Sequence, residues 1–418
     1  MWIRLFVHFV GRSDRVCTSL QPIDRTKIKV TLDTASIANA NKESRMHLSR
    51  SLIFSCNLGL LLLAANYFVQ VNSEFFTAAL VGGSVAIPFT YKVGEYVYCQ
   101  FKECDNAEWA IHDPNIFKAK LTKEWKQHVF GQDLALKIIR NMLTSHLVRI
   151  SKKTSKKALV LSFHGGAGTG KTLVAKLLAK VLYKNGLSSS YVRRIHLKDF
   201  LTNLNMDGKK HKLKTEIKRF VQSRTRPLVL FEEVDKLEAG VIDALSPYFD
   251  ESSVDNVSFA NTIFIFTSNY ASREINEEAC RQFTVKTEVD DFDSENFYDI
   301  IRKISYRGTS ADDSTSRTGF ASSEFVKHCL VSSFVPFLPL DMTHVLQCID
   351  ASLTKKLKDH EVSTLDKPER KNDLIKLIYS QIHIVNADRC RKSFSELGCK
   401  KVDDIADREV THLMQADY

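Results

Sequence analysis

The sequence contains no recognisable nucleic-acid-binding module, although its 418 residues carry a formal net charge of +10. Part of the excess lies in residues 1–45, which hold eight basic and four acidic side chains. Basic clusters elsewhere, such as Lys152-Lys153, Lys209-Lys210-His211-Lys212 and Lys355-Lys356, are typical of solvated surfaces. The alternative is that one of these clusters forms a basic patch that binds an acidic domain of a partner protein. We therefore expect no nucleic-acid partner.

The sequence also lacks a second pair of metal-type ligands near Cys99 and Cys104, which argues against zinc at this C-x4-C segment. Nine cysteines are many for a cytosolic chain of this length, so their number favours an oxidising compartment. Three further cysteines have no assigned role and are predicted to be buried free thiols: Cys280, Cys329 and Cys390. Asn256-Val257-Ser258 is the one N-glycosylation sequon in the sequence, and it falls in a predicted loop.

A phosphate-binding loop occupies the middle of the chain. It reads Gly165-Gly166-Ala167-Gly168-Thr169-Gly170-Lys171-Thr172 and fits the pattern G-x-x-x-x-G-K-[ST]. A buried strand is predicted before it and an apolar helical pattern after it, so the context supports the motif. Backbone N–H groups would surround the phosphates, Lys171 would reach the β- and γ-phosphates, and the Thr172 hydroxyl would ligate Mg²⁺. We predict a nucleoside triphosphate site.

Two adjacent carboxylates end the next apolar segment of the chain, Pro227–Leu237. Neighbouring side chains of a strand point to opposite sides, so Glu232 can hold the Mg²⁺ water shell while Glu233 orients an attacking water. Asn269 follows a third apolar strand, at the carboxyl end where parallel sheets bind ligands, and would sense the γ-phosphate. The pattern predicts hydrolysis of the bound triphosphate rather than transfer of its phosphate to a substrate.

Together these segments resemble the AAA+ ATPases of the Clp-like branch and, within them, the torsins of the endoplasmic reticulum lumen. The resemblance covers about residues 74 to 418. Its motifs are the phosphate loop, Phe231-Glu232-Glu233-Val234-Asp235-Lys236, Val129-Phe130-Gly131-Gln132, Phe334-Val335-Pro336-Phe337-Leu338-Pro339-Leu340 and Gly398-Cys399-Lys400. A P-loop kinase or a small GTPase explains neither Asn269 nor the last motif.

The resemblance implies roles for residues outside the phosphate loop. It implies that Phe130, Gly131 and Gln132 contact adenine and that Lys400 projects onto the γ-phosphate. It also implies a disulfide between Cys348 and Cys399 that touches the nucleotide site, and a paired state for Cys99 and Cys104.

Several departures from the torsin pattern bear on the mechanism. Torsins usually carry Asn where Thr172 stands and Asp where Glu232 stands, but nucleotide binding should survive both changes. Clp-like relatives place a transition-state arginine just before the strand at 335–340, whereas residues 325–340 contain no Arg. An aromatic-Gly pore loop is also missing between Tyr191 and Phe220. We expect slow turnover by the isolated chain and a non-threading or partner-dependent mechanism.

The amino-terminal region has three predicted parts. Residues 1–45 form an unassigned extension, and Met46 is a possible true start of the chain. Residues 46–73 have the layout of a secretory signal, or of a signal anchor if Met1 is used. Residues 74–105 form a broken hydrophobic segment that resembles the membrane-associating region of torsins. A transmembrane helix and a buried hairpin remain alternatives for this segment.

The predicted fold class is α/β: an AAA+ P-loop domain at 106–340, with a parallel sheet covered by helices on both faces, and a small helical lid at 341–418. Strands are predicted near 158–163, 192–197, 227–232, 261–266 and 334–338, and a mobile loop at 308–323. Lid helices are predicted at 342–357, 371–384 and 389–397.

Two classes of function compete. The first is an ATP hydrolase of the endoplasmic reticulum and nuclear-envelope lumen that uses ATP and Mg²⁺ and remodels proteins or membranes. It would be activated by luminal domains of membrane proteins and would form homo- or hetero-oligomers. The second is a nucleotide-gated scaffold or filament-forming module with little turnover. Glu233 favours the first, and the missing arginine makes that hydrolase partner-dependent.

Overall fold

The computed structural model describes residues 114–196, 204–238, 240–250, 253–285, 289, 292–307, 326, 328–359, 368–385, 390 and 392–416. The chain divides into two units, 1–95 and 96–418, and every described residue belongs to the second. The predicted signal at 46–73, the hydrophobic segment at 74–105 with its cysteine pair and the loop at 308–323 lie outside these residues. Within the described part, no helix has the length and apolarity needed to cross a membrane.

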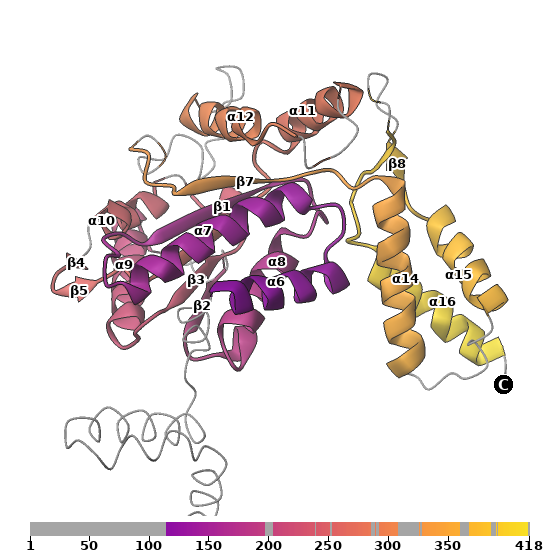
Figure 1. Ribbon diagram of the computed structural model, residues 1–418, viewed down its shortest axis with the longest axis horizontal. Helices are drawn as coiled ribbons and strands as arrows, with labels where there is room; N and C mark the ends of the chain where they lie inside the picture. The colour runs from indigo at the N-terminus through magenta and orange to yellow at the C-terminus, as the bar shows by residue number, and fades with distance from the viewer. Residues whose placement is uncertain are drawn as a thin grey trace, which may run out of the picture. The chain divides into compact units, whose positions relative to one another are not determined.

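A five-stranded parallel sheet forms the centre of the large domain (Figure 1), with the order β2-β3-β6-β1-β7. Its strands are β1 (Leu159–Gly165), β2 (Val192–Ile195), β3 (Leu228–Phe231), β6 (Ile263–Ser268) and β7 (Ser333–Phe337). All five predicted strands are present. The first strand, β1, lies between β6 and β7, so the phosphate loop that follows it emerges among the carboxyl ends of its neighbours.

Alternate side chains of the central strands pack into two separate cores, one on each face of the sheet. In β6, Ile263 and Ile265 face one core while Phe264 and Phe266 face the other. The first core is covered by α6 (Pro114–His128), α7 (Asp133–Ser151) and α8 (Lys171–Leu182). The second is covered by α9 (Met206–Gln222), η5 (Ile242–Leu245), α10 (Ser246–Asp250), α11 (Ser272–Val285) and α12 (Ser294–Arg307). Strands buried on both faces explain the continuous apolar runs of the sequence.

The carboxyl-terminal lid has its own apolar core, formed by α14 (Met342–Asp359), α15 (Pro368–Ser380) and α16 (Val402–Ala416). The first two helices agree with the prediction, although α15 ends at Ser380. The predicted helix at 389–397 is wrong. Phe394 and Ser395 form β9, which pairs with β8 (Ile384–Val385) in a short antiparallel hairpin. Gly398 then adopts a left-handed φ of 52°, which ends this segment before α16 begins.

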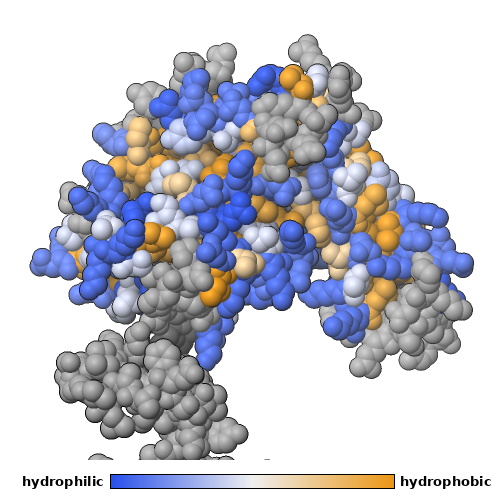
Figure 2. Space-filling view, viewed as in Figure 1, coloured by the Kyte–Doolittle hydropathy of each residue, from blue (hydrophilic) through white to orange (hydrophobic). Residues whose placement is uncertain are grey.

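The surface in Figure 2 is mainly hydrophilic, with hydrophobic residues scattered between charged and polar ones. Two of the exposed large apolar side chains, Leu173 and Leu397, belong to segments at the phosphate loop. Most of the buried apolar side chains of the described chain lie in its three cores.

Candidate functional site

The phosphate loop connects the end of β1 to the start of α8, as the motif predicts. The ammonium of Lys171 turns back into the loop, where its Nζ donates to the carbonyl oxygens of Gly165 and Gly166 at 2.7 Å each. Its third partner is Asn269 Oδ1 at 2.9 Å. Thr169 Oγ1 closes the loop by donating to Gly166 O at 2.8 Å. The lysine and the predicted sensor asparagine therefore meet at one point.

The Lys171 side chain is nearly inaccessible to solvent, and this changes its acidity. Burial lowers the pKa of the Lys171 ammonium to about 8. The negative charges of Asp235 and Glu233 oppose this shift, and the positive charge of Lys400 adds to it. The charges of the segment that follows β3 and of the lid therefore act on the same ammonium.

The two neighbouring carboxylates at the end of β3 face different surroundings. Glu233 lines the cavity above the loop, has a left-handed φ of 54° and is half exposed. Its backbone N–H donates to Thr267 Oγ1 at 3.1 Å, and its carboxylate accepts from Lys236 Nζ at 2.7 Å. The Glu232 carboxylate pairs with the guanidinium of Arg194 at 3.0 Å and with His196 Nδ1 at 2.9 Å, both beside β2.

Two residues that the sequence did not single out lie beside this site: Asp235 contacts Asn269, and His164 contacts the next residue, Tyr270. Asp235 Oδ1 accepts from the Asn269 backbone N–H at 3.0 Å. His164, at the end of β1, lies 2.8 Å from Ser162 Oγ through Nε2 and 3.2 Å from Tyr270 O through Nδ1. Burial lowers the pKa of His164 to about 3, so its imidazole is neutral at physiological pH. Each is polar at the carboxyl end of a buried strand, which is the one signal that the sequence offered.

The lid reaches the phosphate loop through backbone atoms. The Cys399 N–H donates to Gly168 O at 3.1 Å, and a Cβ on Gly168 would lie 1.9 Å from Leu397 O. A Cβ on Gly398 would lie 2.5 Å from Gly168 O. Only glycines permit this approach. The next residue, Lys400, lines the same cavity as Lys171.

The cavity between the loop and the lid has a volume of about 630 Å³, which suits a nucleotide. Predicted residues that line it are Ala167, Gly168, Gly170, Lys171, Thr172, Glu233, Asn269, Lys400 and Phe130. The lid contributes Cys348, Ala351, Ser352, Lys355, Cys399, Val402 and Asp403, and the segment before α7 contributes Gln127 and His128.

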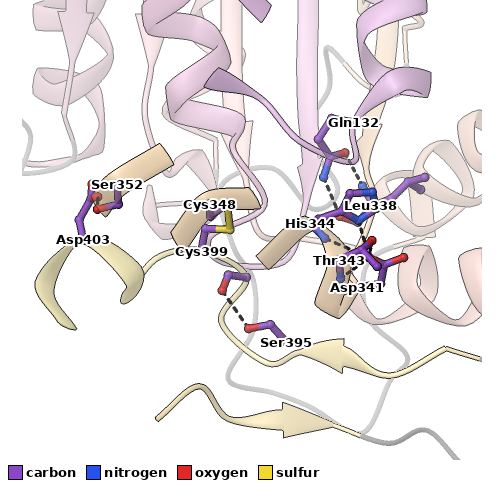
Figure 3. The surroundings of a disulfide bond; sticks show 11 residues. Gln132, Leu338, Asp341, Thr343, His344, Cys348, Ser352, Ser395, Cys399 and Asp403 are labelled. Carbon is purple, nitrogen blue, oxygen red and sulfur yellow. Dashed lines mark hydrogen bonds and ion pairs between the residues drawn. A yellow bond between two sulfur atoms is a disulfide. The ribbon is translucent and has the colours of Figure 1, made fainter. Parts of the chain in front are cut away.

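The segment predicted to contact adenine also forms the hinge to the lid (Figure 3). The Gln132 amide donates to Leu338 O at 2.8 Å and accepts from Leu338 N at 2.9 Å, so a buried side chain clamps the end of β7. A Cβ on Gly131 would lie 2.6 Å from His344 Nδ1. His344 in turn lies 2.9 Å from Asp341 Oδ1. Adenine contact by Gln132 and Gly131 stays a prediction, and Phe130 is the member of the trio that lines the cavity.

Asp341 is the charged centre of this hinge. Burial by itself raises the pKa of Asp341, but hydrogen bonds from His344, Lys392 and Thr343 hold it well below its usual range. The Lys392 ammonium is 2.8 Å from Asp341 Oδ2. The carboxylate therefore connects the start of α14 to the loop before β9.

Two disulfides lie in the described part of the chain. One joins Cys348 of α14 to Cys399, the pair that the resemblance implied (Figure 3). The other joins Cys280 of α11 to Cys390, so the prediction of free thiols at these two positions is wrong. Cys329 is free, as predicted, but exposed rather than buried. No local pattern in the sequence pointed to the second pair, because 110 residues separate its members.

The sequon lies at a hairpin tip. Asp255 and Asn256 form the turn between β4 (Ser253–Val254) and β5 (Val257–Ser258), both with positive φ. The Asn256 side chain is exposed. Its glycosylation stays a prediction.

This fold and this site define the class of protein. A phosphate loop after the central strand, a carboxylate at the end of β3, an asparagine at the end of β6 and a lid lysine over one cavity are the parts of an AAA+ ATPase. In agreement, the chain is similar to the solved S. cerevisiae Hsp104-ADP complex, with a TM-score of 0.50 and 17% identity. The match covers 73% of this chain and 48% of that one, so the chain spans about half of the Hsp104 chain and the likeness concerns the fold.

Sequence comparison identifies the family within the class. The family model described as Torsin matches residues 99–231. A Torsin-like protein of Caenorhabditis elegans is 30% identical over 319 residues, covering 75% of this chain and 82% of the relative. A Torsin-like protein of Drosophila melanogaster is 30% identical over 326 residues, covering 77% and 88%. Human Torsin-3A is 29% identical, covering 73% and 72%. The chain belongs to the torsin family of AAA+ ATPases.

Proposed function

We propose that this chain hydrolyses ATP at the cavity between its phosphate loop and its lid, and that an activating partner is needed for rapid turnover. The observation that carries the proposal is the meeting of Lys171, Asn269, Glu233 and Lys400 at one cavity. Lys171 and Lys400 supply positive charge for the phosphates, and Glu233 is the exposed carboxylate that can accept a proton from water.

Glu233 carries the chemical step in this proposal. In the structure its carboxylate is engaged by Lys236, which is half exposed. A water bound between Glu233 and the γ-phosphate would replace this contact and deliver its proton to the carboxylate as it attacks phosphorus. Asn269 would orient the γ-phosphate, because Asp235 fixes its backbone and Lys171 fixes its amide oxygen.

Thr172 lines the cavity beside the phosphate loop and offers a hydroxyl oxygen of the kind that the hard cation Mg²⁺ prefers, whereas Glu232 is absent from that lining and its carboxylate is held by Arg194 and His196. Thr172 would bind it through its hydroxyl and Glu232 through its water shell. When bound, the ion would neutralise charge on the β- and γ-phosphates. Arg194 and His196 orient the Glu232 carboxylate.

The requirement for a partner follows from an absence in the sequence. Residues 325–340 contain no Arg that could neutralise transition-state charge across a subunit boundary. We propose that luminal domains of endoplasmic reticulum or nuclear-envelope membrane proteins donate one within a hetero-oligomer. Torsin family membership and the two disulfides support a lumenal address, with residues 46–73 as its signal or anchor and Asn256 as a glycan site.

Single-turnover ATP assays test this proposal. The chain from residue 74 onward is mixed with luminal domains of such membrane proteins, each with a matched Arg→Ala variant. We expect very slow turnover alone and stimulation on the order of a thousandfold or more by one partner, lost in its Arg variant. Rapid turnover by the isolated chain would refute the need for a donated arginine. Partners that bind the ATP-bound chain without stimulating its ATP hydrolysis would favour the nucleotide-gated scaffold.

A further inference from the structure

Helices α14 and α16 run in the same direction and are joined by contacts one helical turn apart. The first is the Cys348–Cys399 disulfide, which lies at the start of this pairing. Four residues further along both segments, Ser352 Oγ donates to Asp403 Oδ1 at 2.5 Å. Four residues further again, Lys356 Nζ lies 2.5 Å from Asp407 Oδ1. The spacing of four places the last two contacts on one face of each helix, and the disulfide lies just before α16 begins.

The second of these contacts faces the nucleotide cavity, whereas the third does not. Ser352 and Asp403 line the cavity, and Lys356 and Asp407 are absent from its lining. Ser352 is buried and Asp403 is exposed, so the hydroxyl fixes a carboxylate that a ligand can reach. Asp403 Oδ1 accepts from the serine, which leaves the lone pairs of Oδ2 available in this contact.

A carboxylate with no part in activating water is better placed away from the phosphates of a bound polyanion. Lys171 and Lys400 mark the phosphate end, because the charge of Lys400 is felt by the Lys171 ammonium. Asp403 lies one helical turn beyond Lys400, and its charge would repel a phosphate group placed beside it. It therefore faces the nucleoside part of a bound nucleotide.

The lining around Asp403 distinguishes the sugar from the base. Phe130, Leu173, Ala351 and Val402 supply apolar surface that suits the plane of a base. Two lining residues carry a carboxylate, and Glu233 belongs to the phosphate end. Asp403 is thus the charged acceptor left for the nucleoside, whose donors are the ribose hydroxyls and the exocyclic amino group of adenine. The apolar lining suits the base, so the ribose hydroxyls are the better matched donors.

We propose that Asp403 accepts a hydrogen bond from a ribose hydroxyl of the bound nucleotide, and that Ser352 positions it. The inference rests on the proposed ATP site and adds a residue that recognises the ribose of the nucleotide. It makes the lid a determinant of ribonucleotide selectivity, in addition to its contact with the phosphate loop.

Titration calorimetry with ADP, 2′-deoxy-ADP, 3′-deoxy-ADP and GDP on the full chain tests the inference. For Asp403→Asn we expect about tenfold weaker binding of ADP, since a hydrogen bond to a charged group is lost. The analogue that lacks the contacted hydroxyl should bind the native chain about as weakly, and the substitution should change its affinity little. Ser352→Ala should show a smaller loss with the same dependence on the hydroxyl.

Asp407→Asn is the matched control, because it breaks the neighbouring contact between the same helices outside the cavity. It should bind all four nucleotides as the native chain does. Equal losses for ADP and both deoxy analogues in Asp403→Asn would make Asp403 structural and overturn the inference, as would no loss at all. A loss that instead distinguishes ADP from GDP would assign the carboxylate to the base. A native chain that binds none of the nucleotides would overturn the proposed ATP site itself.

Discussion

Glu232 and Glu233 are adjacent, yet the turn between them gives their side chains unlike partners. Glu233 has a left-handed backbone conformation and its side chain lines the cavity, while Glu232 contacts Arg194 of β2 and His196, which directly follows that strand. These unlike surroundings support the separate roles proposed for the two groups, Glu233 in water activation and Glu232 in the Mg²⁺ water shell.

Replacing Glu233 by Gln tests this division. Glu233→Gln should retain ATP binding but hydrolyse it at least about 100-fold more slowly, because an amide cannot accept the proton of water. The measurement is single-turnover hydrolysis in the presence of an activator, together with ATP titration. Glu277→Gln, on the exposed surface of α11, serves as the control. Unchanged hydrolysis in Glu233→Gln would remove Glu233 from the mechanism.

The lowered pKa of Lys171 predicts a pH dependence of binding. Binding of a polyphosphate needs the ammonium, so ATP affinity should fall by up to about tenfold per pH unit above pH 8. Binding there should take up a proton, which calorimetry in buffers of different ionisation enthalpy measures. Affinity that stays level from pH 7 to 9.5 would contradict the buried ammonium.

The same group has the opposite effect on the stability of the empty protein. Its folded-state pKa of about 8 lies below the ordinary 10.5, so between these values the unfolded chain binds more protons. The contribution of Lys171 to stability therefore rises with pH across this window. The difference in free energy of unfolding between the native chain and Lys171→Met should show this slope.

At the scale of elements, the phosphate loop meets residues 397–400 of the lid, which we call the lid loop, in a close approach of two backbones. Gly398→Ala would place a methyl group 2.5 Å from Gly168 O, so the loops must separate. We expect weaker ATP binding by about tenfold or more, because Lys400 moves with its loop. Equilibrium titration with ATP measures the affinity of the variant and of the native chain.

Gly186→Ala is a matched control for that substitution. Gly186 has a φ of 56°, close to the 52° of Gly398, so both variants bear the same backbone cost of about 1 kcal/mol. A Cβ on Gly186 meets its nearest atom at 3.5 Å, which is ordinary contact. Both variants should lose stability, and Gly398→Ala should lose more and also lose affinity. Equal affinities would show that the lid loop has no part in binding.

The elements that the sequence predicted well have local signals. The five strands appear as apolar runs, and the loop motif falls between a strand and a helix. The helix predicted at 389–397 was wrong, because this part of the lid forms one strand of a hairpin that ends at Gly398. Adenine contact by Gln132 stays a prediction, but its clamp on Leu338 could not be foreseen, because nothing in the sequence reveals that its amide meets a backbone 206 residues away. Long-range pairings of this kind depend on the assembled fold.

At the scale of the molecule, the lid is attached to the large domain in two places. The main chain passes through the hinge at Leu338–Asp341, and the Cys280–Cys390 disulfide ties α11 to the segment before β9. Replacing both cysteines by serine should lower the free energy of unfolding by about 2–4 kcal/mol under oxidising conditions. Thermal unfolding followed by circular dichroism measures the change.

Cys329→Ser is the control for this pair, since Cys329 is free and exposed. It should leave the melting temperature nearly unchanged. A double variant of Cys280 and Cys390 that melts with the native protein would show that the second attachment adds nothing to stability.

The position of β1 between β6 and β7 has a consequence for biosynthesis. A hydrogen bond from Val160 N to Ser332 Oγ spans 172 residues at the border of the β1–β7 pairing. During vectorial synthesis, the β7 side of β1 therefore stays unpaired until nearly the whole large domain has been translated. Unpaired strand edges invite association with other chains. A nascent chain stalled before residue 333 should depend on holdase chaperones, and ribosome-bound intermediates of that length should aggregate once released.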